Sequence, residues 1–194
     1  PVIVDTALIA LSRDELRRYM VNKGYVHATV DYTIDTTRRR RATVRYRIHA
    51  GEPYLITDYR LSSGDAYMDS LLRTEPPLIR PGQRFDRDEL DRERQRITSL
   101  LRRNGYFAFH RDYIYFNADS ATGTPDRVDL DMHIRPFHMA TDSLPIDRPH
   151  RRYLIDSVRI LTDDNPLRPD SLRPATDTLN IRGVDILYAS GRRM

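Results

Sequence analysis

Asn22-Lys23-Gly24-Tyr25 recurs as Arg103-Asn104-Gly105-Tyr106, and Asp31-Tyr32 recurs as Asp112-Tyr113 at the same offset of 81 residues. A repeat at a fixed offset is typical of chains built from similar modules. Strings of small modules usually organise partners rather than perform chemistry. The repeat therefore directs the search for function towards binding surfaces.

A helix precedes each copy of the repeat. Ser12 begins a capping-box pattern that predicts a helix running to about Lys23, and Asp86 begins a second helix with a similar start. Gly24 and Gly105 then supply the left-handed residue at which a helix commonly ends. The second helix is the longer of the two.

Alternating apolar and polar residues predict a strand hairpin after each helix. In the first copy the strands are Val26–Ile34 and Ala42–Ala50. In the second copy they are Tyr106–Phe116 and Val128–Ile134. One departure is Arg111, which falls at an inward position of its predicted strand.

A strand is also predicted before the helices. Tyr54-Leu55-Ile56 recurs as Tyr153-Leu154-Ile155, and Asp65–Leu72 predicts a short helix between the first strand and the long helix. The complete module therefore reads strand, helix, helix, strand, strand over Tyr54–Pro136. Near the end of the chain, Ile181–Tyr188 predicts one further strand.

These elements divide the chain into three segments. Residues 1–52 are a partial module without its first strand, in which Thr6–Leu11 is the remnant of a first helix. Residues 53–137 are a complete module, and residues 138–194 are a linker and the start of a third. Gly51-Glu52-Pro53 is too short for a free tether, so it restricts the angle between the first two modules.

The complete module resembles a POTRA domain of the BamA/TamA-type outer-membrane protein assembly factors, also called bacterial surface antigens. The resemblance is carried by the order βααββ, by Gly82-Gln83-Arg84-Phe85-Asp86, by Arg94 and Ile97, and by Gly105-Tyr106. It implies an α+β fold of tandem modules, each with a three-stranded sheet packed against two helices.

The same resemblance implies a place and a role. The expected location is the periplasmic face of the outer membrane of a Gram-negative bacterium, in a chain continuous with a membrane β-barrel. The expected partners are unfolded outer-membrane β-barrel clients and periplasmic or outer-membrane proteins. The expected role is a scaffold for barrel insertion, with no enzyme activity and no cofactor.

The strand after the long helix is expected at an edge of the sheet, where its free backbone groups can pair with an incoming strand. The candidate residues in the first module are Val26, Ala28, Val30, Tyr32 and Ile34. Those in the second are Phe107, Phe109, Tyr113 and Tyr115. The alternative is that charge or the next module shields these edges.

Arginine accounts for 31 of the 32 basic residues, and the net charge is +4. Arginine with aromatic residues is also typical of RNA-binding repeats, which are the alternative class. The aromatic residues of the second hairpin share the inward parity, however, which favours core packing. The run Arg38, Arg39, Arg40 and Arg41 is a candidate contact for anionic lipid, or a solvated hairpin tip.

Catalytic and metal-binding signals are weak. The sequence has no cysteine and none of the common hydrolase, zinc-protease or phosphate-loop motifs. His27 with His49, and His110 with His133, pair across neighbouring strands without a clear third ligand. Asp129 and Asp131 follow the polar parity of a wet sheet face. No apolar run approaches the roughly 18 residues of a membrane helix.

Overall fold

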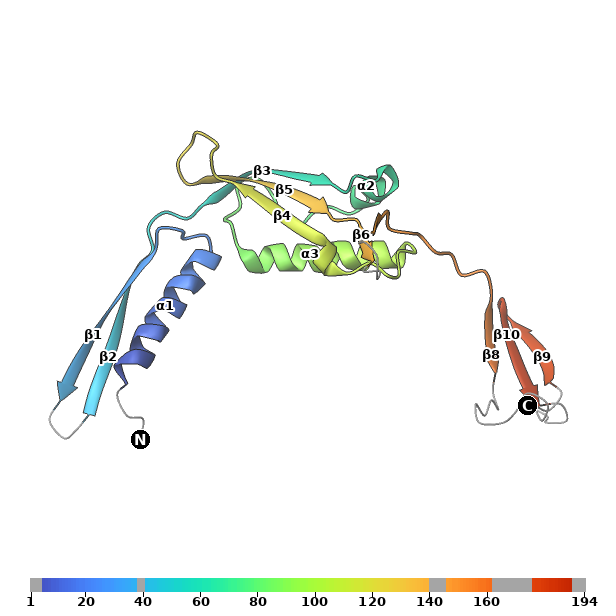
Figure 1. The fold of residues 1–194 in the computed structure, drawn as a ribbon, viewed down its shortest axis with the longest axis horizontal. Coiled ribbons are helices and arrows are strands. Elements are labelled where there is room, and N and C mark those ends of the chain that lie inside the picture. Colours follow the sequence, from blue (N-terminus) through green and yellow to red (C-terminus); the bar gives the residue numbers. More distant parts are fainter. Residues whose placement is uncertain (1–4, 38–40, 140–145, 162–175, 190–194) are drawn as a thin grey trace. The chain divides into compact units, whose positions relative to one another are not determined.

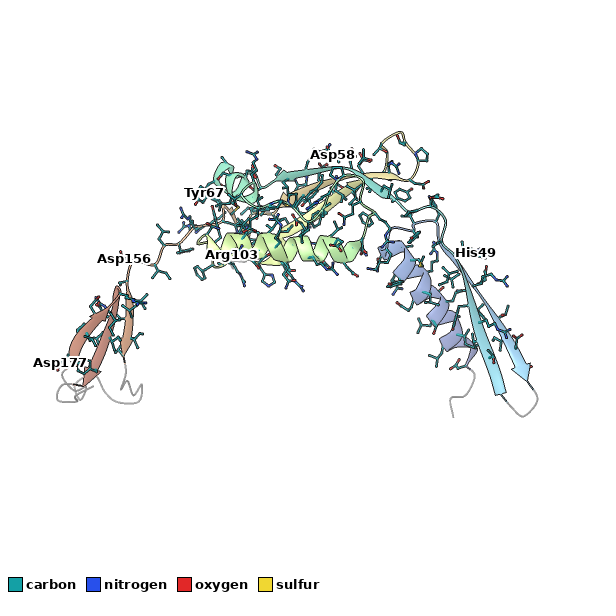
Figure 2. All side chains as sticks on the ribbon, turned by 180° about the vertical axis from the view of Figure 1, so that it is seen from behind. His49, Asp58, Tyr67, Arg103, Asp156 and Asp177 are labelled. Carbon is teal, nitrogen blue, oxygen red and sulfur yellow. The ribbon has the colours of Figure 1, made fainter. Side chains whose placement is uncertain are left out.

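The computed structural model describes residues 5–37, 41–139, 146–161 and 176–189. They fall into two compact units, residues 1–152 and 153–194, which are treated separately below. Figure 1 shows the helices and strands of each unit, and Figure 2 adds the side chains of the described residues. Within the described residues, no helix is both long and apolar enough to cross a membrane.

The first module consists of α1 (Thr6–Asn22), β1 (Thr29–Thr37) and β2 (Arg41–His49), with β1 and β2 paired antiparallel. The helix begins at Thr6 instead of Ser12, because Asp5 accepts hydrogen bonds from the Ala7 and Leu8 amides. The predicted capping box at Ser12 is therefore wrong. The Ser12 hydroxyl lies inside the helix and donates to the Leu8 carbonyl.

The second module contains three strands, two α-helices and a short 3-10 helix. Its elements are β3 (Leu55–Ser62), α2 (Ala66–Leu72), α3 (Arg87–Arg103), η1 (Arg111–Tyr113), β4 (Ile114–Asp119) and β5 (Arg127–Ile134). The sheet order is β3-β5-β4, with β3 parallel and β4 antiparallel to β5. The predicted α+β fold and its βααββ order are confirmed, and β4 lies at an edge.

Apolar side chains from both helices fill the space under this sheet. One cluster joins Met68 and Leu72 of α2 to Ile97 and Leu101 of α3 and Met132 of β5. The sheet lies along one side of α3 (Figure 1). Leu90, Ile97 and Leu101 are buried as their helical spacing predicts, and they fix α3 against the sheet.

Both repeated glycines end their helices in the same way. Gly24 and Gly105 have φ of 90° and 97°, which an L-residue rarely adopts. The amide of Tyr25 donates to the Met20 carbonyl (3.0 Å), and the amide of Tyr106 donates to the Leu101 carbonyl (3.1 Å). Each end is therefore a Schellman motif, and the repeat encodes a shared backbone turn.

The sequence predicts a strand directly after this turn, but the chain does not enter a strand there. The Ala28 amide bonds to the Tyr25 carbonyl and the Phe109 amide to the Tyr106 carbonyl, so each copy makes a further tight turn. The strands start later, at Thr29 and Ile114. These turns use carbonyl groups that a ladder would otherwise need, which explains the later start of both strands.

The end of the first unit folds back on the second module. β6 (Phe137–Met139) and β7 (Ile146–Arg148) form a small antiparallel ribbon. His150 packs between the rings of Phe109 (4.9 Å) and Tyr113 (4.6 Å) and donates to the Arg135 carbonyl. Arg152 donates to the Asn104 carbonyl. The predicted linker therefore begins with a packed segment.

The second unit contains β8 (Val158–Leu161), β9 (Thr176–Ile181) and β10 (Val184–Ala189). The strand predicted over Ile181–Tyr188 is confirmed from Val184 as β10, but Arg182 and Gly183 both have positive φ and form a hairpin turn that separates Ile181 from it. The strand predicted to open at Tyr153-Leu154-Ile155 starts later, at Val158, and Leu154 and Ile155 are exposed.

The sheet order of this unit is β8-β10-β9, with a parallel and an antiparallel pairing, as in β3-β5-β4. The connection between its first two strands, residues 162–175, lies outside the described residues. It contains far fewer residues than the connection that holds α2 and α3. The order of strands is thus repeated in the described residues of the second unit.

Candidate strand-binding edge

The edge strand β4 alternates between backbone groups that face β5 and groups that face away. The Arg135 amide donates to the Tyr113 carbonyl (2.8 Å), and the register continues as Ile114 opposite Ile134. In an antiparallel ladder, hydrogen-bonded pairs alternate with non-bonded pairs. The backbone groups of Phe116 and Ala118 and the carbonyl of Ile114 therefore point towards the open edge, whereas the Ile114 amide donates to the Arg111 carbonyl.

Two hollows follow this open edge between β4 and α3. The larger holds about 400 Å³, and the smaller about 350 Å³. The first is lined by Asn22, Phe85, Arg87, Asp88, Leu90, Asp91, Arg94, Phe116 and Ala118. The second is lined by Asp91, Arg94, Arg111, Asp112, Ile114, Tyr115 and Arg135. We call the two hollows together the edge groove.

The edge groove has an apolar floor and a charged rim. Phe85, Leu90 and Phe116 supply apolar surface, and the arginines and aspartates above them carry mixed charge. An extended chain placed here could pair with β4 through its backbone and turn alternate side chains towards the floor. The geometry suits recognition of an amphipathic strand with little dependence on its sequence.

Several of the predicted edge residues lie elsewhere. Phe109 is buried in the core, whereas Phe107 is 64% exposed in the turn before η1. Tyr113 belongs to η1, so only Tyr115 of the second group lies on β4. Tyr115 pairs with His133 on the sheet, with ring centroids 5.3 Å apart. The prediction of a common inward parity for this aromatic series is wrong.

The first module shows a similar shift. Val26 is exposed in the turn and Ala28 is buried before the strand, whereas Val30, Tyr32 and Ile34 lie on β1. In the part of the chain that the structure describes, β1 pairs with β2 alone. The first module therefore offers β1 as a second candidate edge, of the predicted length but starting three residues later.

The other predicted sites add little. Arg38, Arg39 and Arg40 lie outside the described residues, and Arg41 begins β2. Arg111 does not point inward from a strand, because it begins the 3-10 helix η1. Across residues 5–37, 41–139, 146–161 and 176–189, no three His, Cys, Asp or Glu side chains gather as a metal site would require.

The groove residues that sequence reasoning missed lie on the edge strand β4 and on one face of the helix α3. Ile114, Phe116 and Ala118 were hidden because the predicted strand started too early. Arg87, Leu90, Asp91 and Arg94 recur on one face of α3 at spacings of three and four residues, as the groove requires. That spacing was the signal available in the sequence. Only its apolar residue, Leu90, was assigned, to the buried face of the helix.

The larger hollow reaches the junction between the two modules of the first unit, where Lys23 is the central residue. Its ammonium donates to both oxygens of Asp86 (3.1 and 2.9 Å) and to Asp88 (2.7 Å). The Asp86 side chain is only 12% exposed, and Arg87 also donates to Asn22 (3.1 Å). The end of α1 is thus joined to the start of α3.

These bonds shift the titration of both partners. The hydrogen bonds to Asp88 and Asp86 raise the pKa of Lys23. Burial on its own raises the pKa of Asp86, but bonds from Lys23 and from the Asp88 amide outweigh it and hold the pKa below its usual value. Each group is therefore stabilised in its charged form at neutral pH.

Lys23→Met is expected to lower the melting temperature most between about pH 5 and pH 10. The contribution of Asp86 is present above its unfolded pKa of about 3.9 and is lost as the pH falls through its lowered folded pKa. The contribution of Lys23 is present below about pH 10.4 and is lost as the pH rises through its raised folded pKa. Thermal melts across the pH range measure the difference.

The matched control for this melt series is Arg18→Met. It removes a positive charge from the same helix, but Arg18 pairs only with Glu15 at an exposed position. Its effect on the melting temperature should be small at every pH. A Lys23→Met effect that stays constant from acid to alkaline pH would contradict the proposed ion pair.

Comparison with known proteins gives a family match for the second module. Residues 54–136 match the family model described as "POTRA: Surface antigen variable number repeat". No curated protein matches the chain. The matched range contains β3, α2, α3, β4 and β5, and therefore the whole edge groove except Asn22.

Three solved structures are similar to the chain. BamA from Haemophilus ducreyi lacking POTRA domains 1-3 is 18% identical over 71% of this chain, with a TM-score of 0.43. BamA POTRA3-5 from Haemophilus influenzae is 13% identical over 97%, with a TM-score of 0.40. POTRA1-3 of the periplasmic domain of Omp85 from Anabaena is 18% identical over 68%, with a TM-score of 0.30. This chain spans 25%, 82% and 51% of their respective lengths.

Proposed function

We propose a function for this chain on the premise that residues 54–136 form a POTRA domain. The chain serves as a periplasmic scaffold in the assembly of outer-membrane proteins. It contacts unfolded β-barrel clients or partner proteins through the open edge of β4. The role is one of binding and requires neither a cofactor nor catalysis.

The observation that supports this proposal most is the open edge of β4 beside the edge groove, which combines an apolar floor with a charged rim. The outward amide and carbonyl groups of Phe116 and Ala118 provide hydrogen bonds, and the groove floor at Leu90 accepts apolar side chains. Barrel strands alternate apolar and polar residues. An unfolded barrel segment therefore has the pattern that this edge fits.

The proposed organisation is a tandem array with divisions at residues 1–52, 53–137 and 138–194. The matching helix ends at Gly24 and Gly105 support the first division. The repeated sheet order of β3-β5-β4 and β8-β10-β9 supports the last. An array of such modules places several edges along one chain, which suits a scaffold for extended clients.

The RNA-binding alternative gains no support from the aromatic side chains. Tyr106 and Phe109 are buried in the core of the second module and cannot stack on bases. Tyr115 lies against His133, with the Arg135 guanidinium 4.9 Å from its ring. These positions do not form a continuous stacking surface, so the protein-binding role is preferred.

Ala118→Pro is expected to weaken binding of a barrel-strand peptide by about tenfold or more. Ala118 has an outward amide that the β4–β5 ladder does not use, so proline removes an edge donor and leaves the ladder in place. The probe is a fluorescent peptide with the sequence of an outer-membrane barrel strand. Fluorescence anisotropy measures its affinity for the full chain.

The control is Asn117→Pro, one residue away on the same strand. Its amide faces β5 opposite Asp131, so proline there should disturb the sheet and shift the circular dichroism spectrum. Unchanged peptide affinity in a folded Ala118→Pro protein would refute binding through β4. If Ala118→Pro loses its fold and Asn117→Pro does not, the assigned direction of the backbone groups is refuted.

A further inference from the structure

We propose that Arg94 protects the open edge of β4 and is displaced when a strand binds. The inference rests on the proposed function, because it concerns regulation of the same edge. It assigns to Arg94 a role in restricting which segments gain access to the edge groove. The residue acts from α3, opposite the strand that it covers.

Arg94 makes three contacts that lie across the groove. Its Nε donates to the Ile114 carbonyl at 3.2 Å, and its guanidinium lies 4.9 Å from the centre of the Phe116 ring. The same guanidinium forms an ion pair with Asp91 one helical turn away. The side chain is 28% exposed, so it is partly covered but still reachable from solvent.

The Ile114 carbonyl is one of the groups that face away from β5. An incoming strand needs this carbonyl as its first acceptor at that end of β4. Arg94 occupies it with a charged donor, and hydrogen bonds to charged groups are stronger than neutral ones. The strand must therefore replace the Arg94 bond before it can pair along the whole edge.

Arg94 and Asp91 also divide the edge groove in two. They are the two residues that line both hollows. The larger hollow lies beside Phe116 and Ala118, and the smaller hollow lies beside Ile114 and Tyr115. Displacement of the Arg94 side chain from Ile114 and Phe116, with its ion pair to the 67% exposed Asp91 kept, would join the hollows along the strand. Edge strands are commonly protected by charged side chains of this kind.

This arrangement favours one class of occupant. A segment that only touches the edge cannot compensate for the loss of the Arg94 hydrogen bond to Ile114 and of the Arg94 contact with Phe116. A segment that also places an apolar side chain on Leu90 and Phe116 gains buried area in return. The predicted partner is an extended amphipathic strand of an unfolded barrel client, and short polar segments are rejected.

The test uses Arg94→Met in the full chain with two capped peptides. One peptide alternates apolar and polar residues, and the other is uniformly polar with the same length. Methionine keeps apolar cover over Phe116 but removes the donor. The expected result is binding about tenfold tighter for both peptides, because each of them must replace the same Arg94 bond in the unmodified chain.

Arg92→Met is the matched control, because it removes the same charge from the same helix. Arg92 is 65% exposed, pairs with Glu89 and lines neither hollow. Its peptide affinities should match those of the unmodified chain. Weaker or unchanged binding in Arg94→Met would overturn the proposal, because a protecting residue must hinder access.

A second measurement separates this proposal from the proposed function. The Arg94 Nε–H resonance, assigned by its absence from Arg94→Met, should exchange slowly with water and shift when the amphipathic peptide is added. Peptide binding with an unshifted resonance overturns the Arg94 role and leaves strand binding intact. Absence of peptide binding in both the unmodified chain and Arg94→Met overturns strand binding itself, and the protecting role with it.

Discussion

Glu93→Ala is expected to lower the free energy of unfolding by about 3–5 kcal/mol. Glu93 is fully buried on α3, and Arg96 donates two hydrogen bonds to it, at 2.9 and 2.7 Å. The Arg96 side chain is itself only 12% exposed. Removal of the Glu93 carboxylate takes away both hydrogen-bonded contacts of the Arg96 charge and leaves it with the longer ion pair to Glu75 (3.8 Å), and loss of a buried partner is among the most destabilising single changes.

Glu93 also holds two other segments in place. The Leu78 amide donates to it at 3.0 Å, which fixes the connection between α2 and α3, and the Tyr59 hydroxyl of β3 donates at 3.3 Å. Burial, with the Glu93 charge as a smaller cause, raises the pKa of Tyr59 well above its usual value. Tyr59 therefore remains a neutral donor, and the alanine variant loses this bond too.

Urea unfolding followed by circular dichroism measures the change. The control is Glu89→Ala on the same helix, which breaks an exposed pair with Arg92 and should change stability by about 1 kcal/mol or less. Glu93→Gln should retain part of the hydrogen bonding and fall between the two. Equal losses for Glu89→Ala and Glu93→Ala would show that the buried pair contributes no more than a surface pair.

The fold of the second module could be predicted because its signals are local. Asp86 at the start of α3 and Gly105 at its end mark the helix by capping chemistry alone, and the alternation of Val128, Leu130 and Met132 marks a strand. Such features depend on neighbouring residues. The internal repeat then showed that the same local features recur.

The position of the edge groove could not be predicted, because it depends on where β4 begins. The turn at Tyr106 and the 3-10 helix at Arg111 reset the alternation, so parity counted from Tyr106 fails before Ile114. Apolar character alone does not distinguish a buried turn residue such as Phe109 from a strand residue. The prediction therefore found the correct segment, but Tyr115 is the one predicted residue of the second module that lies on β4.

The two buried or partly buried ion pairs were missed for another reason. Acidic residues on a helix are usually expected on its solvent face, so Glu93 carried no signal of burial. Lys23 and Asp86 are 63 residues apart, and no local pattern links them. The only lysine of an arginine-rich chain was nevertheless unusual, and it lies at the junction.

Gly24→Ala is expected to lower the free energy of unfolding by about 2–4 kcal/mol and to loosen the junction between the two modules. Gly24 has φ of 90°, and a Cβ there would lie 2.4 Å from the Phe85 carbonyl oxygen. That oxygen is backbone, so it cannot rotate away. The Gly24 carbonyl also accepts the Tyr54 amide at 2.8 Å, and the Phe85 amide donates to Tyr54. The alanine variant must disturb this local backbone network.

Gly82→Ala separates the two causes of this loss. Gly82 has φ of 83° with nothing within 4 Å of an added Cβ, so only the backbone strain of about 1–2 kcal/mol is expected. The rest of the stability loss in Gly24→Ala is due to the close contact between the added Cβ and the Phe85 carbonyl oxygen. If that contact holds the modules together, Lys23→Met should cost less stability in the Gly24→Ala background than in the unmodified chain. Additive losses in the double variant would mean that Gly24 and Lys23 stabilise the chain independently, and that the close approach of Gly24 to Phe85 does not position Lys23 for Asp86.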